Sequence, residues 1–118
     1  MAVDSTGNTY IAGATQGSLD GNINSGGYDI FLTKYDSSGN KQWTKQWGGS
    51  SYDYGYGVAV DSVGNTYITG IIDLNINTSV SDIFLTKYDS NGNKQWTKQW
   101  GTISDDKGYG VTVDNIGN

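Results

Sequence analysis

Two stretches of this chain are nearly identical: KYDSSGNKQWTKQWG at residues 34–48 and KYDSNGNKQWTKQWG at residues 87–101. They differ at one position, where Ser38 in the first stretch corresponds to Asn91 in the second. A fixed-period repeat is the signature of an architecture built from stacked copies of one unit. The fold of the 118-residue chain therefore depends on the structure of one repeat unit.

The repeat has a period of 57 and then 53 residues, counted from a shared opening motif. This motif is VDSTGNTYIAG from Val3, VDSVGNTYITG from Val60 and VDNIGN from Val113. We expect one domain over 1–118 that contains a first unit (3–59), a second unit (60–112) and the start of a third (113–118). The difference in period lies in one segment, residues 14–28 against 71–81, as expected for a surface loop between fixed elements.

Within one unit the apolar residues alternate with a period of two, which predicts strands and no helices. The second unit contains four such strands: GYGVAV (55–60), NTYITG (65–70), DIFLTKY (82–88) and KQWTKQW (94–100). The connecting segments DSVGN and DSNGN supply an Asp that bonds its own backbone and a Gly that takes a positive φ, which favours hairpin turns. The unit is predicted to be a four-stranded antiparallel meander.

Apolar side chains point to both faces of this predicted sheet. In the 82–88 strand, Ile83 and Leu85 share one face while Phe84 and Tyr88 share the other. A sheet with two apolar faces has to be covered on both sides. In the last strand, 94–100, the two tryptophans share a face with a lysine stem between them, as expected for a half-exposed outer strand whose tryptophans pack on a neighbouring sheet. Four-stranded sheets of about 50 residues that pack face to face describe the blades of a β-propeller.

The motifs GVAVDSVGNTYITG, DIFLTKYDSNGNKQWTKQWG and GATQGSLDGNINSGGYDIFLTKYD resemble the bacterial SBBP-type β-propeller repeat over essentially the whole chain. They are more distantly similar to the NHL repeat. The resemblance implies an all-β fold with an inner strand that lines the central channel and an outer strand at the rim. It implies no catalytic activity, and it suggests an extracellular or cell-surface location in a bacterium.

The sequence predicts two blades plus an extra C-terminal inner strand, GYGVTV at 108–113, whereas the first blade has only the stub MAV of its inner strand. An isolated pair of blades leaves two faces uncovered, so partners are expected. One hypothesis is head-to-tail assembly of three or four copies into a closed ring, in which the 108–113 strand of one copy completes the first blade of the next. The alternative is that the chain is a fragment of a longer propeller.

The variable loops are predicted on one side of the sheets and the repeated Asp-x-x-Gly-Asn turns on the other. Function on a rigid scaffold is usually carried by such loops. The candidate ligand-binding residues are Tyr52, Asp53, Tyr54, Asp105 and Asp106, a polar and aromatic set suited to a glycan. The alternative, which we favour for Asp53 and Asp106, is that they play the same structural part in each blade by hydrogen-bonding the loop.

Composition argues against several other classes of function. The chain has no Cys or His, which removes disulfides, thiolate chemistry and the usual zinc ligands, and its twelve acidic residues include no Glu for an EF-hand-type calcium loop. A net charge of −5 disfavours nucleic acid as a partner. No apolar run approaches the about 18 residues of a membrane span. We expect no enzyme, no cofactor and no metal, but a structural or interaction module, with a glycan-binding propeller as the alternative.

Overall fold

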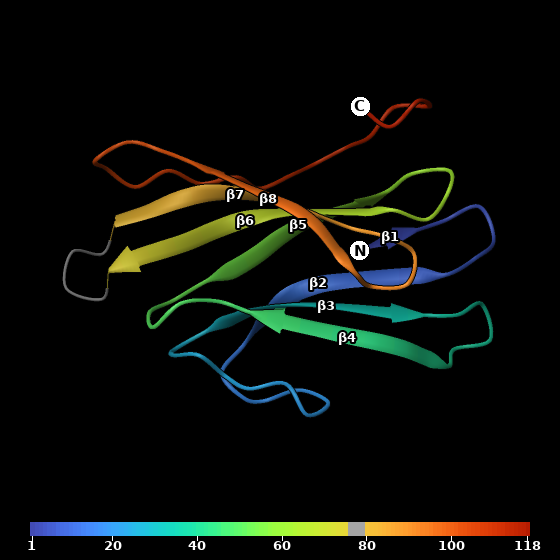
Figure 1. Ribbon diagram of the computed structural model, residues 1–118, viewed down its shortest axis with the longest axis horizontal. Helices are drawn as coiled ribbons and strands as arrows, with labels where there is room; N and C mark the ends of the chain where they lie inside the picture. Colours follow the sequence, from blue (N-terminus) through green and yellow to red (C-terminus); the bar gives the residue numbers. More distant parts are fainter. Residues whose placement is uncertain (76–79) are drawn as a thin grey trace.

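The computed structural model describes residues 1–75 and 80–118, and all regular structure in these residues is β (Figure 1). The strands are β1 (Ala2–Val3), β2 (Thr9–Thr15), β3 (Asp29–Tyr35), β4 (Lys41–Trp47), β5 (Tyr54–Val60), β6 (Thr66–Asn75), β7 (Val80–Tyr88) and β8 (Lys94–Trp100). They form two antiparallel sheets in the orders β1-β2-β3-β4 and β5-β6-β7-β8. The prediction of an all-β chain with two four-stranded, blade-like meanders is confirmed.

The second connection between the middle strands differs from the prediction. We expected a loop over residues 71–81, but pairing continues through Ile72↔Asp82 and Asp73↔Ser81 to Asn75↔Val80, with a register shift before the last pair. The apolar residues Ile71 and Ile72 extend the alternation of β6, a signal hidden by the first copy, where β2 stops at Thr15. Residues 76–79, the rest of the predicted loop, lie outside the described part of the chain.

The five Asp-x-x-Gly-Asn segments, which begin at Asp4, Asp36, Asp61, Asp89 and Asp114, all form the same turn. In the turn that joins β5 to β6, the Asp61 amide donates to the Asn65 carbonyl at 2.9 Å, and the Gly64 amide donates to the Asp61 carbonyl at 3.1 Å. The Asp61 carboxylate accepts bonds from the Val63 and Asn65 amides and from the Asn65 side chain. The glycine has φ of 88°, where other residues are strained. These turns gather at one end of the sheets, as predicted, and the other connections at the opposite end (Figure 1).

Identical sequences have opposite burial in the two sheets. In the first copy of DIFLTKY, Ile30 and Leu32 are fully buried while Phe31 is partly exposed. In the second copy the pattern inverts, so that Phe84 is buried and Ile83 is partly exposed. The reason is that the first sheet packs through the face that carries Ile30 and Leu32, whereas the second sheet packs through the opposite face, which carries Phe84. The two sheets therefore stack in the same orientation, so that opposite faces of the repeat unit meet.

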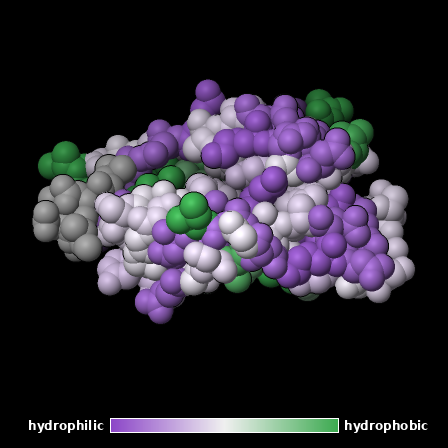
Figure 2. Space-filling model, turned by 60° about the horizontal axis from the view of Figure 1, so that its bottom comes forward, coloured by the Kyte–Doolittle hydropathy of each residue, from purple (hydrophilic) through white to green (hydrophobic). Residues whose placement is uncertain are grey.

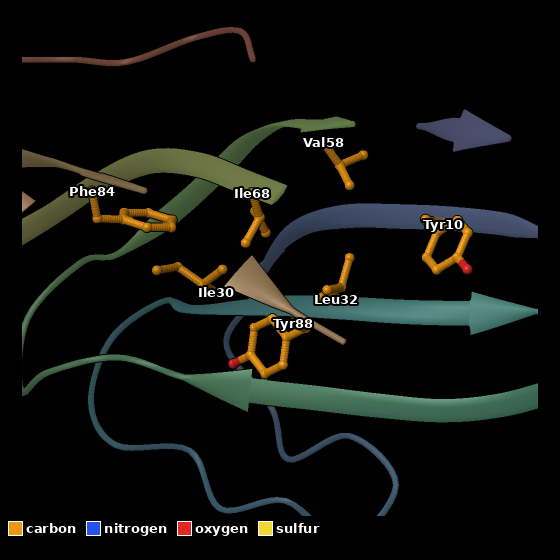
Figure 3. Packing of buried hydrophobic residues seen from close by; sticks show 7 residues of the cluster. All are labelled: Tyr10, Ile30, Leu32, Val58, Ile68, Phe84 and Tyr88. Atoms are coloured by element: carbon orange, nitrogen blue, oxygen red, sulfur yellow. The ribbon is translucent and has the colours of Figure 1, made fainter. Parts of the chain in front are cut away.

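The hydrophobic core lies between the two stacked sheets (Figure 3). Its buried members come from both sheets: Tyr10, Ile30 and Leu32 from the first, and Val58, Ile68, Phe84 and Tyr88 from the second. At the outer end of this core, the Trp47 ring lies 6.2 Å from the Phe84 ring and 5.4 Å from the Tyr88 ring, measured between centroids. The expected role of the strand tryptophans in packing on a neighbouring blade is confirmed for Trp47.

The predicted extra C-terminal strand over 108–113 is wrong as a strand, because the structure assigns no strand pairing to these residues. A strand needs a hydrogen-bonded neighbour, and among residues 1–75 and 80–118 no second strand of a third sheet lies beside this segment. Its position is nevertheless that of the next inner strand. Gly108 lies against Ile83 and Thr69 of the second sheet, just as its repeat partner Gly55 lies against Ile30 and Gly13 of the first.

Candidate functional site

The predicted site residues lie on the loops at the end of the sheets opposite to the Asp-x-x-Gly-Asn turns. Tyr52 and Asp53 belong to the loop between β4 and β5, and Tyr54 is the first residue of β5. Asp105 and Asp106 follow β8 in the equivalent loop of the second unit. The structure thus places all five on the expected side, in two neighbouring copies of one loop.

Asp53 and Asp106 organise these loops. The Asp53 amide donates to the Tyr28 carbonyl at 2.7 Å, and the Asp106 amide donates to the Ser81 carbonyl at 2.9 Å. The Asp53 carboxylate accepts the Gly49 amide, and the Asp106 carboxylate accepts the Thr102 amide in the same way. The structural interpretation of this pair is confirmed. Asp53 is fully buried, so its carboxylate is not open to a large ligand.

The tyrosines of this end form a continuous run of ring contacts. Tyr28 lies between Tyr52 and Tyr54, with centroid distances of 5.9 and 5.2 Å. The run continues from Tyr54 to Tyr56 at 6.0 Å, with nearly parallel rings, and from Tyr56 to Tyr109 at 5.0 Å. We call these five residues the tyrosine row. Tyr52, Tyr56 and Tyr109 are 46%, 43% and 64% exposed, so the row presents aromatic surface to solvent.

Asp105 is separate from the tyrosine row in the described residues. Its carboxylate accepts hydrogen bonds from the amide and the hydroxyl of Ser81, both at 3.1 Å. By repeat position Asp105 is the counterpart of Tyr52, so the two copies of the loop carry different chemistry at the same place. Ligand binding by the five predicted residues stays a prediction, and the structure brings together only Tyr52 and Tyr54 among them.

A second candidate surface is the outer face of the second sheet, which the described chain covers only in part. Tyr67, Ile83, Leu85, Trp96 and Trp100 stand there, where the first sheet has Tyr10, Ile30, Leu32, Trp43 and Trp47. Tyr67 is 7% exposed and Gly108 lies against Ile83, whereas the rim of this face is open. Trp100 is 50% exposed, because the two sheets of the described residues leave nothing to pack against it. We call this set the open face. In contrast, the side of the molecule in Figure 2 is mostly polar, with hydrophobic residues at isolated positions.

Sequence reasoning missed a pair of polar hollows on the turn side. The first, of about 180 Å³, lies between successive turns and is lined by Asp4, Tyr10 and Lys34 together with residues 62–64 of the next turn. The second, of about 260 Å³, has the repeat partners Asp61, Tyr67 and Lys87. Aligning the tyrosine and lysine of each unit on the turn Asp would have revealed this recurrence, since their spacing is fixed by the repeat.

Electrostatics in the first hollow follow from these neighbours. Burial alone would raise the pKa of Asp4, but hydrogen bonds from Asn8 and Thr6 outweigh it and lower that pKa to about 2. Burial and a hydrogen bond to Asp4 raise the pKa of the Tyr10 hydroxyl above its usual range. The Lys34 ammonium lies 5.5 Å from the centre of the Tyr10 ring and donates to the Ser90 carbonyl at 3.2 Å. The charged groups of this hollow, Asp4 and Lys34, thus already make their hydrogen bonds to neighbouring residues of the protein.

Over 1–75 and 80–118, no group of three or more His, Cys, Asp or Glu side chains is arranged to hold a metal ion. In the same residues, no helix has the length and apolar character needed to cross a membrane.

Comparison with known proteins agrees with this geometry. The chain is 25% identical, over 129 aligned positions, to regulatory protein FlaEY of Caulobacter vibrioides. The alignment covers 94% of this chain but only 14% of that protein, so the chain spans a small part of its relative's length. The family model of the SBBP β-propeller repeat matches residues 42–73, which run from β4 through the loop with Asp53 into β6. Residues 42–73 of this chain therefore match a β-propeller repeat of the SBBP type.

Proposed function

We propose that the chain is a non-catalytic interaction module whose sheets bind further copies of the same blade, head to tail, until a ring closes. The observation that carries this proposal is the inverted burial of identical sequences. Within one chain, the first sheet already docks its Trp47 face on the Phe84 and Tyr88 face of the second. The open face repeats the first of these surfaces. The outward side of the first sheet repeats the second, with Phe31 and Tyr35 in place of Phe84 and Tyr88.

The contact between copies would therefore be heterologous, because two different surfaces meet. Contacts of this kind close into a ring when the rotation from one copy to the next adds up to a full turn after a whole number of copies. With two blades per chain, three copies make six blades and four copies make eight. The loop over residues 16–28 bonds to the rim strand β4, for example from the Leu19 amide to the Gln46 side chain, and would lie beside the contact.

Strand pairing supports the same direction of assembly. β1 pairs with β2 only through Ala2↔Tyr10 and Val3↔Thr9, so β2 has a free edge over Ile11–Thr15 in the described chain. In the second sheet β5 pairs with β6 from Thr66 to Ile71, with one register shift. The segment 108–113 repeats much of the β5 sequence and would pair with the free edge of β2 in a neighbouring copy.

Light scattering coupled to size exclusion tests the proposal on the 118-residue chain. We expect a single species of three or four times 12.7 kDa. Trp100→Gln should shift this species toward the monomer, because it removes the indole that corresponds to Trp47 in the contact between sheets. Ile103→Gln is the matched control, since Ile103 is 95% exposed in the loop after β8 and off the open face. A monomer in wild-type protein at high concentration would contradict assembly.

A second candidate function is glycan binding by the tyrosine row. Exposed, mutually packed tyrosine rings offer large rigid contact area at low entropic cost, and their hydroxyls supply hydrogen bonds. A glycan array probed with the purified chain, with Tyr52→Ala and Tyr56→Ala as variants, is the test. Binding that survives both substitutions, or no binding at all, would exclude this role for the row.

The role of interaction module also fits the relative named as a regulatory protein. Propeller repeats are scaffolds on which unrelated functions have been built, so the shared repeat supports a scaffold more than a chemistry. Asp29 and Asp53, two carboxylates that face each other beside Gly48, are fully buried and would not reach a substrate. This burial supports a non-catalytic role.

A further inference from the structure

Two buried carboxylates face the same small space beside Gly48. Asp29 and Asp53 are both 0% exposed. Asp29 Oδ1 and Asp53 Oδ2 each lie 2.6 Å from the point that a Cβ on Gly48 would occupy. Because Gly48 has no side chain, these two carboxylate oxygens can approach the same point beside its backbone.

One of these oxygens has no hydrogen-bond partner. Asp29 Oδ1 is buried and unbonded, whereas Asp29 Oδ2 accepts the Ser25 amide at 2.8 Å and the Gln46 side chain at 3.2 Å. The Asp53 carboxylate accepts the Gly49 amide at 2.6 Å and the Asp73 amide at 3.0 Å. A buried carboxylate oxygen without a donor costs free energy, and a second carboxylate opposite it adds repulsion.

No lysine neutralises the pair in the described residues, where the one salt bridge found joins Lys41 to Asp20 on the surface. The site therefore has a deficit of positive charge.

The second unit repeats the arrangement. Asp82 Oδ1 is also buried and unbonded, and it borders the space beside Gly101 together with Asp106 Oδ2. Asp82 and Asp106 are the repeat partners of Asp29 and Asp53, so the same oxygen is left unsatisfied twice. An unsatisfied oxygen that recurs at the same place in both units points to a missing partner, not to a local accident of packing.

We propose that a calcium ion binds between Asp29 and Asp53, and more weakly between Asp82 and Asp106. Calcium prefers hard oxygen ligands in a flexible arrangement. Two carboxylates completed by water make a site with few charged ligands, for which a dissociation constant of about 10⁻⁴–10⁻³ M is typical.

Such an ion would join the loop between β4 and β5 to the start of β3. Asp53 belongs to that loop, while Asp29 begins β3 and holds the end of the connection from β2 through Ser25. The ion would thus fix the loops next to the tyrosine row. The inference does not depend on assembly, because both carboxylates belong to one chain.

The experiment is a thermal melt of the 118-residue chain, treated with EDTA and then titrated with CaCl₂, with MgCl₂ and NaCl at matched ionic strength as controls. We expect 10 mM CaCl₂ to raise the melting temperature by about 5 °C, as follows for a site with a dissociation constant near 1 mM. The controls should have less than half of this effect, because Mg²⁺ gives up its water less readily and Na⁺ carries one charge.

Three variants identify the site. Asp29→Asn keeps the shape, puts an amide donor opposite Asp53, and should remove the calcium shift while melting no lower than wild type in EDTA. Gly48→Ala places a methyl group between the carboxylates and should also remove the shift. Gly49→Ala is the matched control, because its methyl group would meet its neighbours at ordinary contact distances, and it should keep the shift.

The outcomes separate the proposal from its rivals. A calcium shift that persists in Asp29→Asn would place the ion elsewhere and overturn the assignment. A wild-type protein that ignores calcium, while its melting temperature rises between pH 7 and pH 5, would show that a proton and not a cation relieves the pair. Terbium luminescence gives an independent readout, since a lanthanide at Asp53 would lie near Tyr28 and Tyr52.

Discussion

The indole of Trp47 meets the ring of Phe84 edge-on, with an interplanar angle of 83°. Trp47 belongs to the rim strand of the first sheet and Phe84 to the middle of the second, so this contact joins the two sheets. Trp100, the repeat partner of Trp47, has the same neighbours in sequence but no sheet to pack on. Comparing these two tryptophans therefore isolates the contribution of packing between sheets to stability, because their local sequences are nearly the same.

Trp47→Ala should destabilise the monomer by about 3 kcal/mol, since truncation of a packed aromatic residue removes buried area and leaves a cavity. Trp100→Ala should cost less than about 1 kcal/mol, as is usual for an exposed position. Urea denaturation followed by circular dichroism at low protein concentration measures both. Equal costs for the two variants would mean that the open face is covered within the chain.

The turn glycines give a second matched pair. Gly39 and Gly92 have φ of 83° and 84°, so alanine is strained at both, by about 1–2 kcal/mol. A Cβ on Gly39 would meet nothing within 4 Å, whereas a Cβ on Gly92 would lie 3.0 Å from the Trp43 ring. Gly92→Ala should therefore cost about 1 kcal/mol more than Gly39→Ala, because the indole has to move. Denaturant midpoints of both variants decide this, and no difference would place Trp43 away from Gly92.

The lowered pKa of Asp4 predicts that the folded protein loses stability in acid. Its pKa is lowered from 3.8 to about 2 in the folded protein, so its contribution is present above pH 4 and is lost as the pH falls toward 2. Because the side chain is partly exposed, we expect solvent screening to reduce the contribution to roughly 1 kcal/mol. Asp4→Asn should flatten this part of the stability profile between pH 4 and pH 2. An unchanged slope in that variant would assign the acid sensitivity to the other turn residues.

Asp53→Asn should destabilise the protein by about 1–3 kcal/mol, because an amide nitrogen would replace an acceptor that now receives a backbone amide. Asp106→Asn changes the same bond in the second loop, where the surroundings are more exposed, and should cost less. Melting temperatures of the two variants in EDTA provide the comparison. A larger cost at Asp106 would contradict the assignment of Asp53 as the more buried organiser.

Much of the fold could be predicted from the sequence because its signals are local. The alternation in DIFLTKY and the Asp-x-x-Gly-Asn turns fix strands and hairpins wherever they occur. The length of β6 and β7 could not be predicted, since the two copies differ there and pairing beyond Gly70 depends on contacts across the hairpin. The strand predicted at 108–113 did not form, because a strand also depends on its partner.

The candidate site shows the same division. The structural role of Asp53 and Asp106 followed from their position in the repeat. The tyrosine row did not, because Tyr28 and Tyr109 lie far from Tyr52 in sequence and meet its neighbours only after the sheets stack. The unsatisfied oxygen of Asp29 was also invisible, since it depends on which of its neighbours donate.

The last of the five turns has a consequence for folding kinetics. Residues 114–118 form the full set of turn hydrogen bonds, and Gly117 has φ of 89°, although no strand pairing flanks them. The turn is therefore specified by its own five residues. Hairpins form in about 1–10 μs once a turn is in place, far ahead of most long-range contacts. We expect the transition state to contain the hairpins, with high φ-values at the turns and low ones at Trp47, so that docking of one sheet on the next completes folding last.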